Sequence, residues 1–186
     1  MKTACVLLAD GFEEVEAVTP IDYLRRAGVE VTVVGIAGIG PVAGGHGISV
    51  LPDQGPGALA GTYDCVVVPG GGGGSKAIAA DPAAVAAIKR HFAEGKIVAA
   101  ICAAPAVVLH GACGLLVGRR FTGYPGTESE AAAAGAIFVE SRVVRDGNLI
   151  TSRAAGTAGD FARAVAGALA GEGAAEALAD KVLLES

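Results

Sequence analysis

Short, mainly apolar runs alternate along the chain with longer segments in which apolar residues recur at helical spacing. The runs cover residues 3–8, 30–35, 64–68 and 97–101. Continuous apolar runs of this length, rich in valine and isoleucine, are typical of strands buried on both faces of a parallel sheet. We therefore expect these runs to form one parallel sheet at the centre of the protein.

Helical periodicity or helix-boundary signals mark the segments that separate or follow these runs. Pro20 lies inside the first helical segment and predicts a kink or a two-part helix there. Asp81 and Pro82 form a cap and first-turn pair, and Thr127 with Glu130 has the spacing of a capping box. The predicted helices cover residues 13–27, 81–94, a segment from about 105, 127–134, 157–170 and 174–184.

Strands that alternate with helices predict an α/β fold of the doubly wound type, a mostly parallel sheet with helices on both faces. Residues 42–51 are interrupted by glycine and predict a hairpin or an excursion at a sheet edge. Residues 143–152 predict a hairpin around Asp146 and Gly147, and residues 120–122 predict a short strand. No internal repeat or linker is apparent, so we expect a single domain over residues 1–186. Ligands of such sheets bind at the carboxyl edge, in the loops that follow the strands.

Composition and charge narrow the possible functions. The chain has 186 residues, 52% of them hydrophobic, and a net charge of -5 with no basic cluster larger than a pair. This charge pattern argues against nucleic-acid binding. No apolar run suits a signal segment or a membrane span, so we expect no membrane partner and a cytoplasmic location. The four cysteines should then be reduced thiols.

Cys102 occupies the most informative position in the chain. It directly follows the apolar run 97–101, and Pro105 soon after allows the first turn of a helix. A nucleophile between a strand and a helix sits on a sharp elbow that needs small neighbours, here Ala100 and Ala104. The helix amino terminus should lower the pKa of the thiol and make it reactive. The alternative is a cysteine that only fills space in the core.

Three acidic residues, Glu13, Glu14 and Glu16, follow the first strand and therefore lie at the same edge of the sheet. Acidic side chains in a first helical turn are ordinary partners of the helix dipole. One that turns inward would meet Cys102, lose its hydration and hold its proton. Such an acid could stabilise a thiolate and move a proton during a reaction.

The glycine run after Val68 and Pro69 does not have the order of a phosphate-binding loop, because Ser75 precedes Lys76. A glycine turn at this edge can instead direct a bare N–H toward the elbow and, with the N–H of Ala103, form an oxyanion hole. A plain loop that needs glycine for its dihedral angles remains the alternative. The three histidines, at positions 46, 91 and 110, show no metal-binding spacing, so we expect no metal and no cofactor.

Several of these stretches together resemble the ThiJ/PfpI superfamily, most closely the branch of the parkinsonism-associated protein deglycase and its bacterial relatives. The resemblance implies a flavodoxin-like fold, a homodimer, an easily oxidised Cys102, a hydrogen-bonding acid at Glu16 and an oxyanion site from the N–H groups of Gly71 and Ala103. The matching stretches are Ala9-Asp-Gly-Phe-Glu-Glu-Val-Glu-Ala17, Val67-Val-Pro-Gly-Gly71, Ala99-Ala-Ile-Cys-Ala-Ala-Pro105 and Thr151-Ser-Arg-Ala-Ala-Gly-Thr157.

Two departures from the family pattern affect the expected chemistry. Tyr124 stands where many members of the branch have a histidine, and a phenol is a poor base at neutral pH, so proton transfer should fall mainly on Glu16. Ala103 stands where protease-like members have a histidine, which argues against a Cys-His peptidase. His110, about two turns further along the elbow helix, is expected to be structural.

Two functions stay open from the sequence. The first is a cofactor-free glyoxalase or deglycase that acts on a small aldehyde or on a glycated protein, with Cys102, Glu16 and Tyr124 as its catalytic residues. The second is a redox-responsive protective protein or chaperone in oxidative stress, whose Cys102 is oxidised to sulfinic acid without significant turnover. Both depend on the same thiol.

Overall fold

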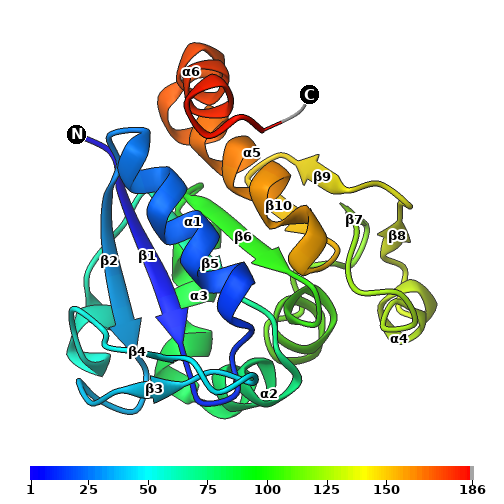
Figure 1. Ribbon diagram of the computed structural model, residues 1–186. Coiled ribbons are helices and arrows are strands. Elements are labelled where there is room, and N and C mark those ends of the chain that lie inside the picture. Colours follow the sequence, from blue (N-terminus) through cyan, green and yellow to red (C-terminus); the bar gives the residue numbers. More distant parts are fainter. Residues whose placement is uncertain (185–186) are drawn as a thin grey trace.

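A six-stranded sheet forms the centre of the protein in the computed structural model, which describes residues 1–184 (Figure 1). The strand order is β2-β1-β5-β6-β10-β9, and every neighbouring pair is parallel except β10 with β9. The strands are β1 (Thr3–Leu8), β2 (Glu30–Gly35), β5 (Cys65–Val68), β6 (Ile97–Ile101), β9 (Val143–Asp146) and β10 (Leu149–Ser152). The predicted mostly parallel sheet is confirmed, and the apolar runs form its strands.

Helices cover both faces of this sheet, as expected for a doubly wound fold. In Figure 1, α1 and α5 lie in front of the sheet and α3 lies behind it. The helices are α1 (Glu14–Arg26), α2 (Gly72–Ala80), α3 (Pro82–Ala93), α4 (Ser129–Ala133), α5 (Ala158–Ala170) and α6 (Glu172–Val182). A π-helix, Pro105–Ala112, follows β6, and two short 3-10 helices cover Pro56–Ala60 and Ala155–Thr157.

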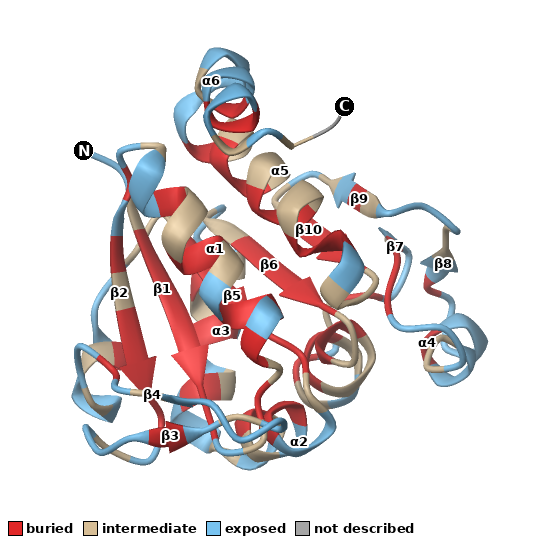
Figure 2. Cartoon of the chain, viewed as in Figure 1, coloured by how far each residue is buried: buried red, intermediate tan, exposed pale blue. Residues whose placement is uncertain are grey.

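Alternate residues of each strand enter two separate hydrophobic cores. In β1, Val6 and Leu8 pack with α1 and α5, whereas Cys5 and Leu7 pack with α2, α3 and the π-helix. The central strands β1, β5 and β6 are buried except for the first residues of β1 and β6 (Figure 2). Because both faces are covered, the functional groups of the sheet must project from its edges.

Smaller elements complete the fold at its margins. A hairpin of β3 (Val42–Ala43) and β4 (Ser49–Val50) lies near the carboxyl ends of β1 and β2, and β7 (Arg120–Phe121) pairs with β8 (Ile137–Phe138). Both predicted hairpins are confirmed, since β9 and β10 also pair antiparallel. None of the helices in residues 1–184 has the length and apolar character that a membrane span requires.

Two local predictions were wrong. The turn expected after β5 is present at Gly70 and Gly71, but the rest of the glycine run is not a loop, because α2 begins at Gly72. A Cβ on Gly74 would lie 2.8 Å from the Phe12 Cα, so glycine lets α2 approach the loop after β1. Thr127 does not cap α4, because its hydroxyl donates to the Tyr124 carbonyl at 2.7 Å. The predicted cap at Asp81 is confirmed, since its carboxylate accepts from Ala84 N at 2.7 Å.

Candidate active site

Cys102 lies on a sharp elbow at the carboxyl end of β6. Its φ angle is +66°, in the left-handed region that side chains other than glycine rarely adopt. Two hydrogen bonds hold the strained backbone: Cys102 N donates to Ser152 O at 3.0 Å, and Tyr124 N donates to Cys102 O at 2.8 Å. Pro105 then opens the π-helix. The predicted elbow is confirmed, and it presents the thiol at the edge of the sheet.

Glu16 is the acidic residue that turns inward from the first turn of α1. Its side chain is 1% exposed, and its Oε2 accepts a hydrogen bond from Gly70 N at 3.0 Å. The Cys102 thiol also donates a hydrogen bond to this carboxylate. Gly70 has no room for a side chain, because a Cβ there would overlap Glu16 Oε2 and lie 2.6 Å from the Cys102 Cβ. The loop after β5 therefore passes directly beside both functional groups.

Burial raises the pKa of Glu16 to about 7, and the nearby charge of Glu13 adds to this effect. The hydrogen bonds from Cys102 and Gly70 act in the opposite direction, because they favour the carboxylate. Glu16 therefore holds a proton over part of the neutral pH range. This agrees with the expectation of an acid that can carry a proton at the site.

The expectation of a lowered pKa for Cys102 was wrong. Burial, together with the charge and the hydrogen bond of Glu16, raises the pKa of its thiol to about 12. The N–H groups of Ala103 and Gly71 oppose this shift. When Glu16 takes the proton, its opposing charge disappears while the two N–H groups remain. The thiolate thus depends on proton transfer to Glu16, and the two groups titrate as a pair.

The backbone N–H groups of Gly71 and Ala103 both face the Cys102 sulfur. Gly71 adopts φ +88°, and a Cβ there would overlap the Gly11 carbonyl, so only glycine fits this turn. The two donors come from the loop after β5 and from the elbow itself. Their position agrees with the predicted pair of oxyanion donors, and their role in a reaction stays a prediction.

Tyr124 contributes its backbone to the site. Its N–H holds the Cys102 carbonyl, while its side chain is 50% exposed and its hydroxyl makes no hydrogen bond within residues 1–184. The structure therefore places Tyr124 beside the elbow without bringing its phenol onto the thiol. His110 lies in the π-helix, where its buried Nδ1 has no hydrogen-bond partner in the described part of the chain.

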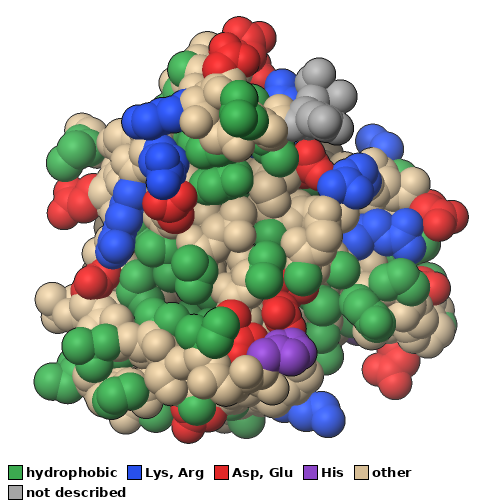
Figure 3. Space-filling view, in the orientation of Figure 1, with side chains coloured by type: hydrophobic (Ala, Val, Ile, Leu, Met, Phe, Trp, Pro, Cys, Tyr) green, Lys and Arg blue, Asp and Glu red, His purple; other side chains and the backbone are tan. Residues whose placement is uncertain are grey.

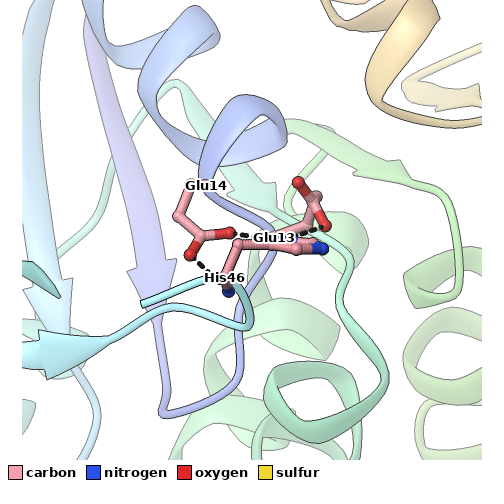
Figure 4. A group of neighbouring side chains, drawn as sticks. All are labelled: Glu13, Glu14 and His46. Atoms are coloured by element: carbon pink, nitrogen blue, oxygen red, sulfur yellow. Dashed lines mark hydrogen bonds and ion pairs between the residues drawn. The ribbon is translucent and has the colours of Figure 1, made fainter. Parts of the chain in front are cut away.

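A second group of titratable side chains was not predicted. Glu13 and Glu14, at the start of α1, meet His46 from the loop between β3 and β4 (Figure 4). Glu14 Oε2 lies 3.0 Å from the His46 Nδ1, and Glu13 Oε2 lies 3.3 Å from the same atom. No spacing in the sequence reveals this contact, because the hairpin brings together residues more than thirty positions apart.

Comparison with known proteins agrees with this geometry. The model of the DJ-1/PfpI family matches residues 2–168. The Parkinson disease protein 7 homolog of Danio rerio is 39% identical over 186 residues, which cover 98% of this chain and 97% of that protein. A deglycase of Pyrococcus abyssi is 37% identical over 152 residues, covering 81% of this chain and 89% of its own.

Solved structures show the same fold over the whole chain. The crystal structure of Drosophila melanogaster DJ-1beta superimposes with a TM-score of 0.93 at 37% identity and covers 100% of this chain and 99% of its own. A Toxoplasma gondii DJ-1 structure described as oxidized has a TM-score of 0.94 at 34% identity, with 100% of both chains covered. The flavodoxin-like architecture is therefore confirmed, and this chain belongs to the DJ-1/PfpI family.

Proposed function

We propose that this protein is a cofactor-free, cysteine-dependent enzyme that acts on 2-oxoaldehydes or on early glycation adducts. Family membership, with relatives named DJ-1 and deglycase, supports a DJ-1-type protective or deglycase role. The observation that carries the finer proposal is the Cys102–Glu16 pair, a thiol hydrogen-bonded to a buried acid of raised pKa.

The first step would be addition of the thiol to the aldehyde carbon. The proton of Cys102 passes to Glu16, and the thiolate forms a C–S bond while the carbonyl π bond becomes an alkoxide. The N–H groups of Gly71 and Ala103 lie where they can stabilise this oxyanion. Glu16 then returns its proton to the alkoxide, which gives a hemithioacetal and leaves a carboxylate.

The same carboxylate can complete the reaction. Glu16 removes the hydrogen from the former aldehyde carbon and delivers a proton to the neighbouring keto carbon through an enediol. The product is a thioester of a 2-hydroxy acid on Cys102. Water hydrolyses this thioester and restores the thiol, so methylglyoxal and water yield lactate without an external oxidant or reductant. On a glycated protein the same addition would start at the carbonyl carbon of the adduct.

The alternative function is a redox-responsive protective protein. A thiolate that forms by proton transfer to Glu16 is also the species that peroxide oxidises, first to sulfenic and then to sulfinic acid. Cys102 is partly accessible, whereas the other three cysteines are buried. The Toxoplasma gondii relative described as oxidized makes this alternative worth testing beside turnover.

The deciding experiment measures both activities on one preparation. Lactate production from methylglyoxal is followed for the wild type and for Cys102→Ala, and intact mass is recorded after mild peroxide. We expect turnover in the wild type, none in Cys102→Ala, and unchanged turnover in the control Cys113→Ala, whose cysteine is buried in the core. Turnover that persists in Cys102→Ala would exclude the enzymatic scheme. A gain of two oxygens without any turnover would favour the redox alternative.

We also propose that the protein forms a homodimer in the cytoplasm. Figure 3 shows hydrophobic side chains gathered over α1 and the β3–β4 hairpin. Val15, Val18 and Ile48 are 48%, 44% and 59% exposed, and Glu14 links α1 to the hairpin through Ile48 N. Exposed apolar surface of this kind marks interfaces. Light scattering should give twice the chain mass, and Val18→Asp should give the single-chain mass.

A further inference from the structure

His91 is a buried titratable side chain that the proposed reaction does not use. It lies in the last turn of α3 and is 1% exposed. Its Nδ1 lies 2.7 Å from the Ala87 carbonyl oxygen, and its Nε2 lies 3.0 Å from Tyr63 N. A carbonyl oxygen only accepts hydrogen bonds and a backbone N–H only donates them, so Nδ1 carries the ring proton and Nε2 is the acceptor. These two partners together fix a neutral imidazole.

Tyr63 ends a segment, residues 56–63, that lies against α3. The guanidinium of Arg90 donates to Leu59 O at 2.9 Å and to Gly61 O at 2.8 Å. The Tyr63 ring stacks on the His91 imidazole, with centroids 6.0 Å apart and an angle of 22° between the planes. Leu59 is 5% exposed and packs in the hydrophobic core that α3 covers. The segment thus covers part of this core, and Arg90 and His91 hold it there.

The contacts made by Arg90 and His91 respond differently to pH. A guanidinium stays charged throughout the range in which the protein is folded, so the hydrogen bonds of Arg90 do not change with pH. An imidazole takes up a proton near pH 6.5. In His91 that proton would enter at Nε2, where it would point at the Tyr63 N–H. The hydrogen bond is then lost, and two N–H groups are left without an acceptor in a buried place.

The charges around His91 also disfavour its protonated form. They are those of Arg90, Lys96 and Glu94, two cations and one acid. Lys96 already pairs with Asp64, whose Oδ1 lies 3.1 Å from its Nζ. Burial is the main cause that lowers the pKa of His91, and the two cations add to it, whereas the hydrogen bond to the helix backbone opposes it. The 3-10 helix Pro56–Ala60, α2 and β5 also pack on α3, and their titratable side chains are Lys76 and Cys65.

We propose that His91 is an acid-sensitive clamp: its neutral imidazole holds segment 56–63 on α3, and its protonation releases the segment and uncovers the core around Leu59. The closed form binds the proton less tightly than the open form, so acid shifts the equilibrium toward the open form. The shift begins below about pH 6.5, the ordinary pKa of an exposed imidazole, and grows by up to about tenfold per pH unit.

The clamp is separate from the features discussed above. Its contacts are all made within one chain, and α3 lies behind the sheet, whereas α1, which we assign to the homodimer, lies in front of it (Figure 1). Segment 56–63 leads into the amino end of β5, whereas Cys102 follows the carboxyl end of β6. The inference therefore stands whether or not the dimer forms and the proposed reaction occurs.

The test is amide hydrogen exchange of the full chain, followed by NMR from pH 5 to 8 and corrected for the intrinsic pH dependence of exchange. We expect protection of the Tyr63 amide to be nearly constant above pH 7 and to fall about threefold or more by pH 5. The Ala99 amide of the central strand β6 should not lose protection. An equal loss at Ala99 would overturn the proposal, because acid would then be unfolding the whole chain.

The sign of the effect separates His91 from other groups that titrate in this range. Burial raises the pKa of Glu16, and the Glu14 carboxylate raises the pKa of His46. Protonation of Glu16 or His46 between pH 7 and pH 5 therefore stabilises the fold. A loss of protection in the same range has the sign expected of His91 and not of these groups.

Two variants and one measurement without mutation complete the test. His91→Gln should abolish the pH dependence at Tyr63, because a carboxamide can accept from Tyr63 N without titrating. Arg90→Gln is the matched control, and it should lower Tyr63 protection at every pH while keeping the pH dependence. In the wild type, ring nitrogen NMR should show the Nδ1–H tautomer of His91. The proposal is overturned if Tyr63 protection stays constant down to pH 5, if His91→Gln keeps the decrease, or if the ring proton lies on Nε2.

Discussion

Glu14 and Glu16 lie two positions apart in the first turn of α1, and both side chains are almost fully buried, yet their pKa values shift in opposite directions. Burial raises the pKa of Glu16 to about 7, and its few hydrogen bonds do not offset this. Burial also acts to raise the pKa of Glu14, but hydrogen bonds from the His46 side chain and from three backbone N–H groups outweigh it and lower the value to about 2.

The comparison shows that the number of donors around a buried carboxyl, and not its burial alone, decides which protonation state it keeps. Glu14 enters a glycine-rich loop whose N–H groups converge on it, so it stays charged. Glu16 meets one backbone N–H and a thiol, so it can hold a proton. The first turn of α1 thus carries one carboxyl that stays ionised, that of Glu14, and one that can exchange its proton, that of Glu16.

The largest effect is expected where a side chain would displace Glu16 from Cys102. Gly70→Ala places a Cβ over the Glu16 carboxylate, so we expect loss of turnover and a decrease in unfolding free energy of about 2 kcal/mol. Urea unfolding and the lactate assay measure the two effects. Gly72→Ala is the matched control, because no atom lies within 4 Å of the added methyl and Gly72 is helical. Equal behaviour of the two variants would contradict the described packing.

Glu14→Gln tests whether the charge of Glu14, the other buried carboxyl of α1, stabilises the fold. The pKa of Glu14 lies at about 2 in the folded protein and at 4.5 without perturbation, so its charge stabilises the fold above about pH 4.5. That contribution is lost as the pH falls from 4.5 toward 2. Urea unfolding between pH 3 and 7 should therefore show a smaller acid-dependent loss of stability in Glu14→Gln than in the wild type. Parallel pH curves would show that Glu14 is not the stabilising anion.

The smallest effect on activity is expected for a change of the Tyr124 side chain. The phenol of Tyr124 is half exposed and makes no hydrogen bond within residues 1–184, whereas its backbone N–H donates a hydrogen bond to the Cys102 carbonyl. Tyr124→Phe keeps this N–H, so kcat/KM for methylglyoxal should fall by no more than about threefold, well below the loss expected for Glu16→Gln. A loss as large as that of Glu16→Gln would make Tyr124 a principal proton donor.

The sequence predicted the sheet and the elbow well because both follow from local pattern. Unbroken apolar runs mark buried parallel strands, and Cys102 between such a run and Pro105 marks a strand–helix turn. The sequence also predicted that one of the three glutamates in the first turn of α1 points inward. The start of α2 was missed because the five consecutive glycines from position 70 to 74 have low helix propensity. Gly72, Gly73 and Gly74 are nevertheless helical, and Gly74 packs closely against Phe12.

The electrostatics of the site could not be predicted from sequence. The helix terminus suggested a lowered pKa for Cys102, but the degree of burial and the charge of Glu16 depend on how three strands and α1 pack. The His46 cluster was hidden for a similar reason. His46 reaches Glu14 only because the β3–β4 hairpin folds back over the amino end of α1, and that register has no local signature.

The central claim is that Cys102 and Glu16 share a proton, and the pH dependence of Cys102 alkylation by iodoacetamide tests it most directly. Mass spectrometry of the Cys102 peptide gives the rate from pH 5 to 11. In the wild type we expect the rate to rise through about pH 7, as the pair loses its first proton, and then to level off. Glu16→Gln removes the carboxylate charge that opposes the thiolate, so its rate should keep rising above pH 7 instead of levelling off. Identical profiles for the two proteins would contradict the account.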